Sequence, residues 1–339
     1  MSKNVRRVCV VIPTKNEENS IATVIHDVRT AIETSGFGDP LVLVTDDSVD
    51  GTESAAREAG ATVVRAGGIG LGYAMGVGLR NAAHTECDYI VSVDGDGQAD
   101  PSEIPAFLEP LESGRADLVL GSRFLEKGLV KYRYRWLNRL GIRMLSWLLR
   151  FFSGQRFTDS HGGIRAMRRQ VVAELTLTGT HSYVQETIID AVQRGYRVIE
   201  IPSVWKERQH GSTRVVSSIP RYAAHTLPVL LVKSGKHITW LTTGGAVFAL
   251  AAVIGFMAIL VEESFSITAL FARLPALLLI ALLVMVGTQM FFTGIVLELL
   301  RNIARHVDRI GGPSRDHQVV RPVLGCRRVR GAQSRRDRN

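Results

Sequence analysis

Cysteine is scarce in this chain, with three residues among 339 (Cys9, Cys87 and Cys326). They have neither the spacing of metal ligands nor the even number of a disulfide framework, which indicates a reducing compartment. No signal peptide is expected, because the apolar run 8–12 is short and leads directly into polar residues. Lys and Arg exceed Asp and Glu, 41 against 32. These bases lack the interleaved aromatics of a nucleic-acid groove, so we expect no nucleic-acid partner.

Charge is missing altogether from two long stretches, residues 238–261 and 274–297. As helices, each would extend about 36 Å and cross a bilayer with some tilt. The alternative is a pair of buried core helices, although soluble proteins seldom need uncharged runs of this length. The sequence therefore predicts two transmembrane helices.

The charges beside these stretches predict how the two helices are oriented across the membrane. Residues 262–273 contain two acids and one base, whereas residues 301–339 contain eleven Arg and three Asp. Because positively charged segments stay in the cytoplasm, we expect an integral protein of the cell membrane with both termini and the large N-terminal part cytoplasmic. The tail 298–339 is expected to be basic and disordered. Anionic membrane lipids are the expected partner of its charge.

Upstream of the first stretch, short β-rich runs alternate with longer helical ones. The expected strands are 8–12, 41–45, 62–65, 89–93, 118–121 and 198–202, and the expected helices are 18–34, 52–59, 70–83, 104–111 and 185–194. This alternation predicts an α/β domain with a parallel, doubly wound sheet. Ligands of such sheets bind beyond the carboxyl ends of the strands.

Four of the expected strands end in residues that can bind ligands. These residues are Pro13, Lys15, Asn16 and Glu17, then Asp46, Asp47 and Asp50, then Asp94, Asp96 and Gln98, and finally Ser122 and Arg123. Asp94 and Asp96, on backbone made permissive by Gly95 and Gly97, offer hard oxygen ligands to a divalent cation that could hold a diphosphate. An ordinary polar turn is the alternative. The convergence of four strand ends favours the metal site.

Two basic, apolar segments predict contact with a membrane surface. Lys131–Gly154 holds six bases and no acid, and its Trp, Leu, Met and Phe residues recur at spacings of three or four. We expect an interfacial amphipathic helix over 131–153; the alternative is a surface helix packed on the sheet. A second such helix is expected over 216–237, after a catalytic domain of residues 1–215. The basic segment Glu207–Arg214 could close over phosphates or simply be solvated.

Taken in order, seven motifs resemble those of the family 2 glycosyltransferases. They read VVIPTKNEE, DDSVDGT, VDGDGQADP, LVLGSRF, TDSHGGIRAMRR, QETIIDAVQRGYRVIEIP and RQHGSTR, and they span residues 8 to about 214. More narrowly, they are similar to the polyprenyl-phosphate glycosyltransferases typified by dolichol-phosphate mannosyltransferase. The resemblance implies a GT-A fold, Rossmann-like with a mostly parallel sheet. It also implies inverting transfer of one mannose or glucose from GDP-mannose or UDP-glucose to a polyprenyl phosphate at the cytoplasmic face.

The resemblance also assigns roles to individual residues. The nucleoside would be held by Pro13, Lys15, Glu17, Val44 and Asp46 or Asp47. Mg²⁺ or Mn²⁺, and through it the diphosphate, would be bound by Asp94, Asp96 and Gln98, with Gly95 in the same loop. The phosphates would also be contacted by Arg123 and Arg214. Three departures stand out. Lys15 replaces a common aromatic residue, Arg214 replaces the usual Lys, and the motif DDSVDGT is one residue short, which leaves Asp46 and Asp47 as alternatives.

The acceptor phosphate is already an anion at pH 7, so it needs cations more than a general base. We expect the acceptor phosphate to be collected by Arg123, Arg133, Arg135 and Arg139, with Asp159 as an orienting group. Together with the metal ligand Asp96, Arg123 and Asp159 are the expected catalytic residues. Three alternatives remain: another lipid or polysaccharide acceptor, a processive synthase, and a non-catalytic membrane scaffold. The missing QxxRW motif and the two spans speak against the synthase, and the retained carboxylates speak against the scaffold. A homo-oligomer stays open.

Overall fold

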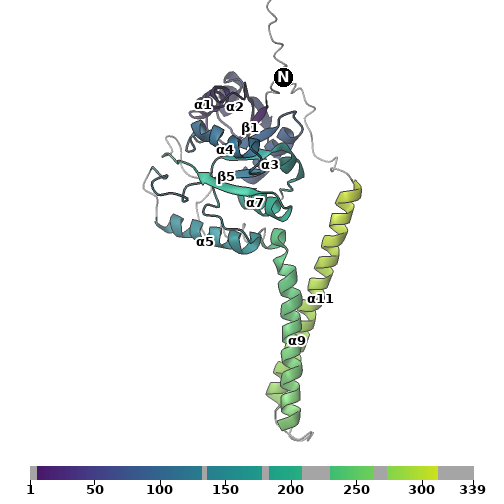
Figure 1. The fold of residues 1–339 in the computed structure, drawn as a ribbon. Helices are drawn as coiled ribbons and strands as arrows, with labels where there is room; N and C mark the ends of the chain where they lie inside the picture. Colours follow the sequence, from purple (N-terminus) through teal and green to yellow (C-terminus); the bar gives the residue numbers. More distant parts are fainter. Residues whose placement is uncertain (1–5, 132–135, 178–182, 208–229, 263–272, 312–339) are drawn as a thin grey trace, which may run out of the picture. The chain divides into compact units, whose positions relative to one another are not determined.

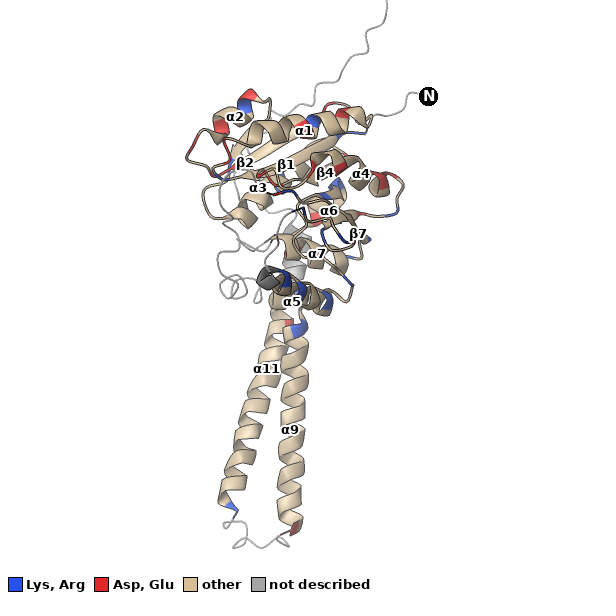
Figure 2. Cartoon of the chain, turned by 90° about the vertical axis from the view of Figure 1, so that its left-hand side faces the viewer, with Lys and Arg blue, Asp and Glu red and all other residues tan. Residues whose placement is uncertain are grey.

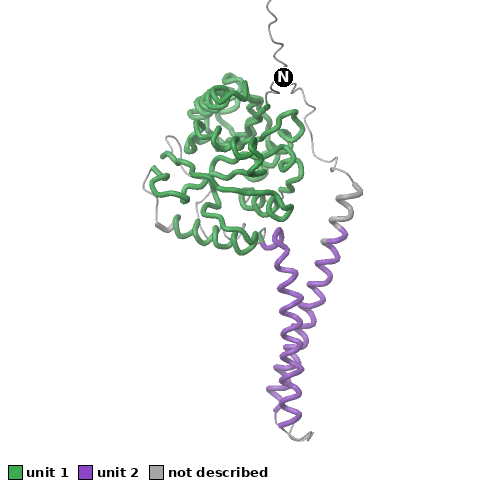
Figure 3. The backbone as a smooth tube through the Cα atoms, viewed as in Figure 1, with its two compact units in different colours: residues 1–230, 319–339 green, residues 231–318 purple. Residues whose placement is uncertain are grey.

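The computed structural model describes residues 6–131, 136–177, 183–207, 230–262 and 273–311 (Figure 1). The chain divides into two compact units, residues 1–230 with 319–339 and residues 231–318 (Figure 3). The predicted segment 216–237 lies mostly outside the described residues, as do Arg133, Arg135 and Arg214.

A seven-stranded sheet in the order β3-β2-β1-β4-β6-β5-β7 forms the first unit. Its strands are β1 (Val8–Thr14), β2 (Leu41–Asp46), β3 (Thr62–Arg65), β4 (Tyr89–Ser92), β5 (Leu118–Ser122), β6 (Arg165–Arg168) and β7 (Val198–Pro202). β1, β4 and β5 are buried along their whole length, as their unbroken apolar sequences predict for strands covered on both faces. The predicted mostly parallel, Rossmann-like α/β fold is confirmed.

The expected strands did not include β6, which runs antiparallel to both β4 and β5 and makes the sheet mixed. The reason lies in how the chain returns to the sheet. Thr158 Oγ1 lies 2.6 Å from Ser122 Oγ, at the carboxyl end of β5. Because the chain re-enters the sheet at the edge where β5 left it, the next strand has to run in the opposite direction.

Helices connect the strands and cover both faces of the sheet (Figure 1). They are α1 (Ile21–Thr34), α2 (Thr52–Glu58), α3 (Leu71–Ala83), the 3₁₀ helix η1 (Pro101–Glu103), α4 (Ile104–Glu112), α5 (Trp136–Ser153), α6 (Arg169–Glu174) and α7 (Tyr183–Gln193). In α1 the buried residues recur at helical spacing, which is the face that the sequence predicts. Within this unit, α5 lies on the side away from α1 and α2 (Figures 1 and 2).

Two long helices, α9 (Lys236–Glu262) and α11 (Leu274–Gly311), form the second unit and pack against each other. Lys236–Glu262 and Leu274–Leu300 are long and apolar enough to cross a membrane, and they contain the two predicted spans. Only 11% and 6% of their most apolar windows are buried. Core helices of a soluble protein would be mostly covered, so this exposure argues against that alternative.

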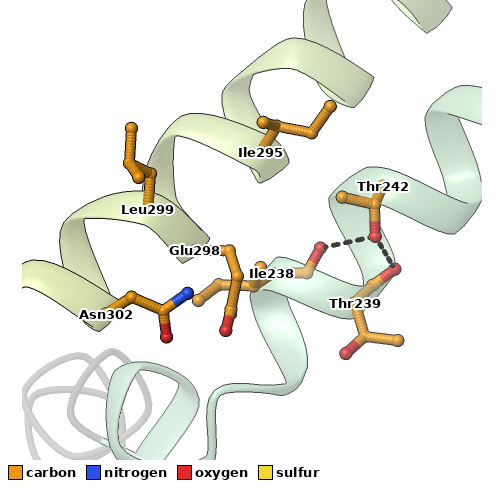
Figure 4. A pocket seen from close by; sticks show the side chains of 7 residues that line it. All are labelled: Ile238, Thr239, Thr242, Ile295, Glu298, Leu299 and Asn302. Atoms are coloured by element: carbon orange, nitrogen blue, oxygen red, sulfur yellow. Dashed lines mark hydrogen bonds between the residues drawn. The ribbon is translucent and has the colours of Figure 1, made fainter. Parts of the chain in front are cut away.

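Glycines form the contact between α9 and α11. A Cβ atom at Gly287 would lie 2.9 Å from the carbonyl oxygen of Gly245 and 3.0 Å from the backbone nitrogen of Ala249. Small residues that let two backbones approach this closely are typical of membrane helix pairs. At one end of the pair is a groove of about 440 Å³, lined by Ile238, Thr239, Thr242, Ile295, Glu298, Leu299 and Asn302 (Figure 4).

Replacing Gly287 by Leu is expected to separate these helices, because the new side chain would collide with backbone atoms that cannot move aside. Overpacking of this kind costs about 2 kcal/mol, and thermal unfolding of the purified protein in detergent measures the loss. Gly255→Leu is the matched control, since a Cβ there would meet only Ile280, at 3.7 Å. Equal unfolding temperatures for the two variants would show that the close contact is not what holds the pair together.

Candidate active site

The loops after β1, β2 and β4 meet at one edge of the sheet. In the parallel register Thr14 is paired with Asp46, and the Thr14 hydroxyl donates a 2.8 Å hydrogen bond to Asp46 Oδ1. The loop after β4 runs against the end of β1, because a Cβ at Gly95 would lie 2.8 Å from Thr14 Cγ2 and 3.2 Å from the Pro13 carbonyl oxygen. The structure therefore brings Pro13, Asp46 and Gly95 together, as the sequence predicts.

The loops after β1 and β2 are joined by hydrogen bonds. The Asn16 amide donates to Ser48 Oγ at 2.6 Å, and Val49 N donates to Asn16 Oδ1 at 3.0 Å. Asn16 has a positive φ of 56°, which Asn tolerates better than most residues. Lys15 is exposed and Glu17 half-buried on this joined pair of loops. By contrast, the Val44 side chain lies within the hydrophobic core.

Asp46 and Asp47, which the short motif leaves as alternatives, differ in burial. Asp46 is fully buried, its Oδ1 accepts from Thr14 and Ser48, and its Oδ2 has no hydrogen-bond partner. Arg65 is 3.9 Å from that oxygen. Asp47 is half-buried and accepts a 2.7 Å bond from the Gly68 amide. A buried acceptor without a partner is costly, so Asp46 is the residue whose oxygen would be satisfied by a ligand donor.

Asp94, Asp96 and Gln98 follow β4 and are all half-buried, so their side chains can reach a ligand. Asp96 Oδ1 accepts from the Gln98 amide at 3.1 Å, and Gly97 has a φ of 72°, which turns the loop. The described residues hold no group of three or more His, Cys, Asp and Glu that could bind a metal. Two carboxylates and an amide oxygen still fit Mg²⁺ or Mn²⁺, because such ions often take their remaining ligands from substrate phosphates and water.

Arg123 and Asp159, which the sequence places 36 residues apart, form a buried ion pair. Arg123 is 4% exposed and Asp159 1% exposed. The guanidinium donates to both carboxylate oxygens, Nε to Oδ2 at 2.6 Å and Nη2 to Oδ1 at 2.8 Å. Burial alone raises the pKa of the Asp159 carboxyl, but attraction and hydrogen bonds from Arg123 outweigh it and lower that pKa below 3.8. Asp159 is therefore a fixed anion that orients Arg123.

Several residues that sequence reasoning missed hold this pair in place. Glu200, in β7, accepts hydrogen bonds from the backbone amides of Thr158 and Asp159 at 2.8 and 3.0 Å. Burial raises the pKa of Glu200, and these hydrogen bonds oppose the rise. Gln185 Nε2 donates to the Ser160 carbonyl at 3.0 Å. One signal was available for Glu200, because an acid between the isoleucines of an apolar strand needs buried partners.

His161 lies beside the Arg123–Asp159 pair and is half-buried. Its amide donates to Asp159 Oδ1 at 2.9 Å, and its ring Nδ1 lies 2.9 Å from Ser160 Oγ. Burial, together with the nearby charge of Arg123, lowers the pKa of His161 to about 4. The ring is thus neutral at pH 7 and adds no positive charge to the site.

One expected acceptor arginine, Arg139, is described and lies exposed on α5. This helix buries Ile142, Leu145, Leu149 and Phe152 and leaves a stripe of Leu140, Met144, Trp147 and Phe151 exposed. Trp147 and Phe151 stack with ring centroids 5.9 Å apart. Figure 2 shows basic residues along the same helix. The helix thus packs on its own unit through one face and presents an apolar, basic surface on another.

Together, the mixed sheet and the carboxylate loop after β4 define a GT-A type domain, the fold of many nucleotide-sugar-dependent glycosyltransferases. Residues 9–176 match the model of "Glycosyl transferase family 2". The chain is 34% identical over 60% of its length to glycosyltransferase AglJ of Haloferax volcanii, and it spans 65% of that relative, slightly less than two thirds. It is 31% identical over 63% of its length to an undecaprenyl-phosphate mannosyltransferase of Micrococcus luteus, of which it spans 89%.

Among solved structures, the fold is similar to glucosyl-3-phosphoglycerate synthase from Mycobacterium tuberculosis, crystallised with Mn²⁺, uridine diphosphate and glucosyl-3-phosphoglycerate. The TM-score is 0.53 at 25% sequence identity, and the match covers 68% of this chain and 80% of that one. The chain belongs to glycosyl transferase family 2.

Proposed function

We propose that this protein transfers a single mannose or glucose, with inversion, from a nucleotide sugar to a polyprenyl phosphate at the cytoplasmic face of a membrane. The observation that carries the proposal is that the Asp94–Gln98 loop packs on the end of β1, where Thr14 bonds Asp46, a buried carboxylate whose Oδ2 lacks a hydrogen-bond partner. Two candidate spans and the similarity to an undecaprenyl-phosphate mannosyltransferase support a lipid acceptor.

In this proposal Asp94, Asp96 and Gln98 would hold Mg²⁺ or Mn²⁺, and the ion would supply positive charge to the diphosphate leaving group, a contribution of several kcal/mol. The M. tuberculosis neighbour was crystallised with Mn²⁺ and uridine diphosphate, which supports a divalent ion. Asp46 accepts a hydrogen bond from the nucleobase, beside the loop of Pro13, Lys15 and Glu17. Arg214 contacts the phosphates from the basic segment.

The acceptor side of the proposed site depends on fixed positive charge. The acceptor phosphate attacks the anomeric carbon as an anion, so no residue has to remove a proton from it. Asp159 holds Arg123 in one orientation. A cation fixed in this way stabilises developing charge without having to reorganise during the reaction. Asp96 is proposed to act at the metal. Arg133, Arg135 and Arg139 are proposed to gather the lipid phosphate from the membrane surface.

The proposal is tested by incubating the purified full-length protein with GDP-mannose or UDP-glucose, a divalent cation and a polyprenyl phosphate. The mass of the lipid product identifies the sugar, and its anomeric configuration tests inversion. 3-Phosphoglycerate, the acceptor portion of the neighbour's product, serves as the competing acceptor. Sugar transfer to 3-phosphoglycerate with none to lipid would overturn the lipid acceptor.

The surface of α5 yields a separate prediction. Replacing Arg139, Arg143 and Arg150 with Gln is expected to raise the KM for a long-chain polyprenyl phosphate in anionic vesicles by about tenfold or more, since each base near such a surface contributes about 1 kcal/mol. Hydrolysis of the nucleotide sugar should be unchanged. The matched control changes Arg7, Arg29 and Arg57, which pair with exposed or half-exposed acids elsewhere on the unit. An equal rise in KM for both triple variants would contradict a membrane-facing role for α5.

A further inference from the structure

Residues 203–206, here the 203–206 strap, follow β7 and connect three parts of the site. The Ser203 amide donates to the Ser122 carbonyl at 3.0 Å, next to Arg123. At the other end, the Lys206 amide donates to the Gln98 carbonyl at 2.8 Å, and Lys206 Nζ lies 2.8 Å from Asp100 Oδ2. The strap therefore runs from the carboxyl end of β5 to the loop of the proposed metal ligands.

Two sets of hydrogen bonds fix the middle of the strap. Glu103 accepts hydrogen bonds from Ser203 Oγ at 2.7 Å and from the Val204 amide at 2.8 Å. In addition, the Trp205 amide donates to the Leu129 carbonyl at 2.9 Å, and the Lys131 amide donates to the Trp205 carbonyl at 2.9 Å. The segment that leads toward α5 is thus tied to Trp205, and the loop after β4 is tied to the next residue of the strap, Lys206.

The indole of Trp205 is 8% exposed and packs on the buried ion pair. The Arg123 guanidinium carbon lies 4.2 Å from the ring centroid, which is within the range of a cation–π contact. On another side the ring meets Gly163, where a Cβ would lie 2.9 Å from Trp205 Cζ2 and 3.2 Å from Ala99 Cβ. The guanidinium that Asp159 orients in its plane is therefore also covered on one face by Trp205.

From these contacts we infer that Trp205 is a positioning residue that couples the loop of Asp94, Asp96 and Gln98 to the Arg123–Asp159 pair. The backbone around Trp205 fixes Gln98, and its ring fixes Arg123, so the two groups that would handle the phosphates keep one relative placement. This inference rests on the proposed function, because it assigns Trp205 to the same nucleotide-sugar site. In this role Trp205 acts through Arg123 and the loop of Gln98.

The test compares Trp205→Leu, Trp205→Phe and the core variant Phe107→Leu in the full-length protein in detergent. The readout is the affinity for Mn²⁺ in the presence of UDP or GDP, measured from the electron paramagnetic resonance signal of free Mn²⁺. Trp205→Leu is expected to weaken Mn²⁺ binding at least tenfold, since it removes the face that covers Arg123. Trp205→Phe, which keeps an aromatic face, should bind within about threefold of the wild type.

Phe107→Leu controls for general destabilisation, because Phe107 is fully buried beneath β5 and lies outside the strap. It should lower the unfolding temperature but leave Mn²⁺ binding unchanged. Wild-type affinity in Trp205→Leu, or equal weakening in Phe107→Leu or Trp205→Phe, would overturn the inference. A wild-type protein that binds Mn²⁺ with neither nucleotide would overturn both proposals. Binding without transfer to lipid would overturn only the proposed acceptor.

Discussion

Replacing Asp96 with Ala is expected to abolish sugar transfer while the protein stays folded. The Asp96 side chain is half-buried in the loop after β4, outside the core. Losing one of two carboxylate ligands should remove several kcal/mol of stabilisation from the transition state, a fall in rate of about a thousandfold or more. The rate of formation of the glycosylated lipid, in detergent at saturating Mn²⁺, measures the effect, and circular dichroism checks the fold.

Asp50→Asn is the matched control for this prediction, because Asp50 is an acid at the same edge of the sheet. Its carboxylate accepts from the Thr52 amide at 3.1 Å and so helps to begin α2, and these hydrogen bonds lower the pKa of Asp50 against the effect of desolvation. The substitution should cost a little stability and leave sugar transfer intact. Normal turnover in Asp96→Ala would place the metal elsewhere, and equal inactivation of both variants would point to a general electrostatic effect.

Hydrophobic periodicity was enough to predict most of the first unit. The strand Thr62–Arg65 and the strand Val198–Pro202 match their predicted limits, because short β-branched runs with Gly or polar residues within two positions of each end leave few alternatives. The direction of β6 was not predictable in this way. It depends on where the chain returns after α5, and that position is set by contacts such as the one between Ser122 and Thr158.

The site was predictable where ligands follow strands directly and less so where distant segments meet. Asp94 and Asp96 follow a buried strand, so their position at the sheet edge comes from the parallel topology alone. Asp46 and Asp47 are adjacent in sequence, and they differ in burial and in the Asp46 oxygen that lacks a hydrogen-bond partner. No spacing rule relates Glu200 to Asp159 or Trp205 to Arg123, because those contacts exist only after the sheet is complete.

Burial also decides how much the Arg123–Asp159 pair matters for stability. Replacing Asp159 with Asn would leave a buried guanidinium without its counter-charge, and breaking a buried pair in this way typically costs about 3–5 kcal/mol. Because folding lowers the pKa of Asp159, its contribution is complete above pH 3.8 and is lost as the pH falls through the folded-state pKa. Measurements at pH 7 therefore report the whole effect. We expect a large fall in unfolding temperature, together with loss of sugar transfer as Arg123 loses its orientation.

Asp117→Asn provides the comparison that isolates burial. Arg197 binds Asp117 through two hydrogen bonds of 2.9 Å, the same two-point geometry as in the buried pair. The Arg197 side chain, however, is 57% exposed, whereas the Arg123 side chain is 4% exposed. Water and salt can replace the lost carboxylate at Arg197 but cannot reach Arg123, so Asp117→Asn should shift the unfolding temperature much less and leave activity unchanged. Equal shifts for the two variants would mean that burial of the Arg123–Asp159 pair adds nothing to its role.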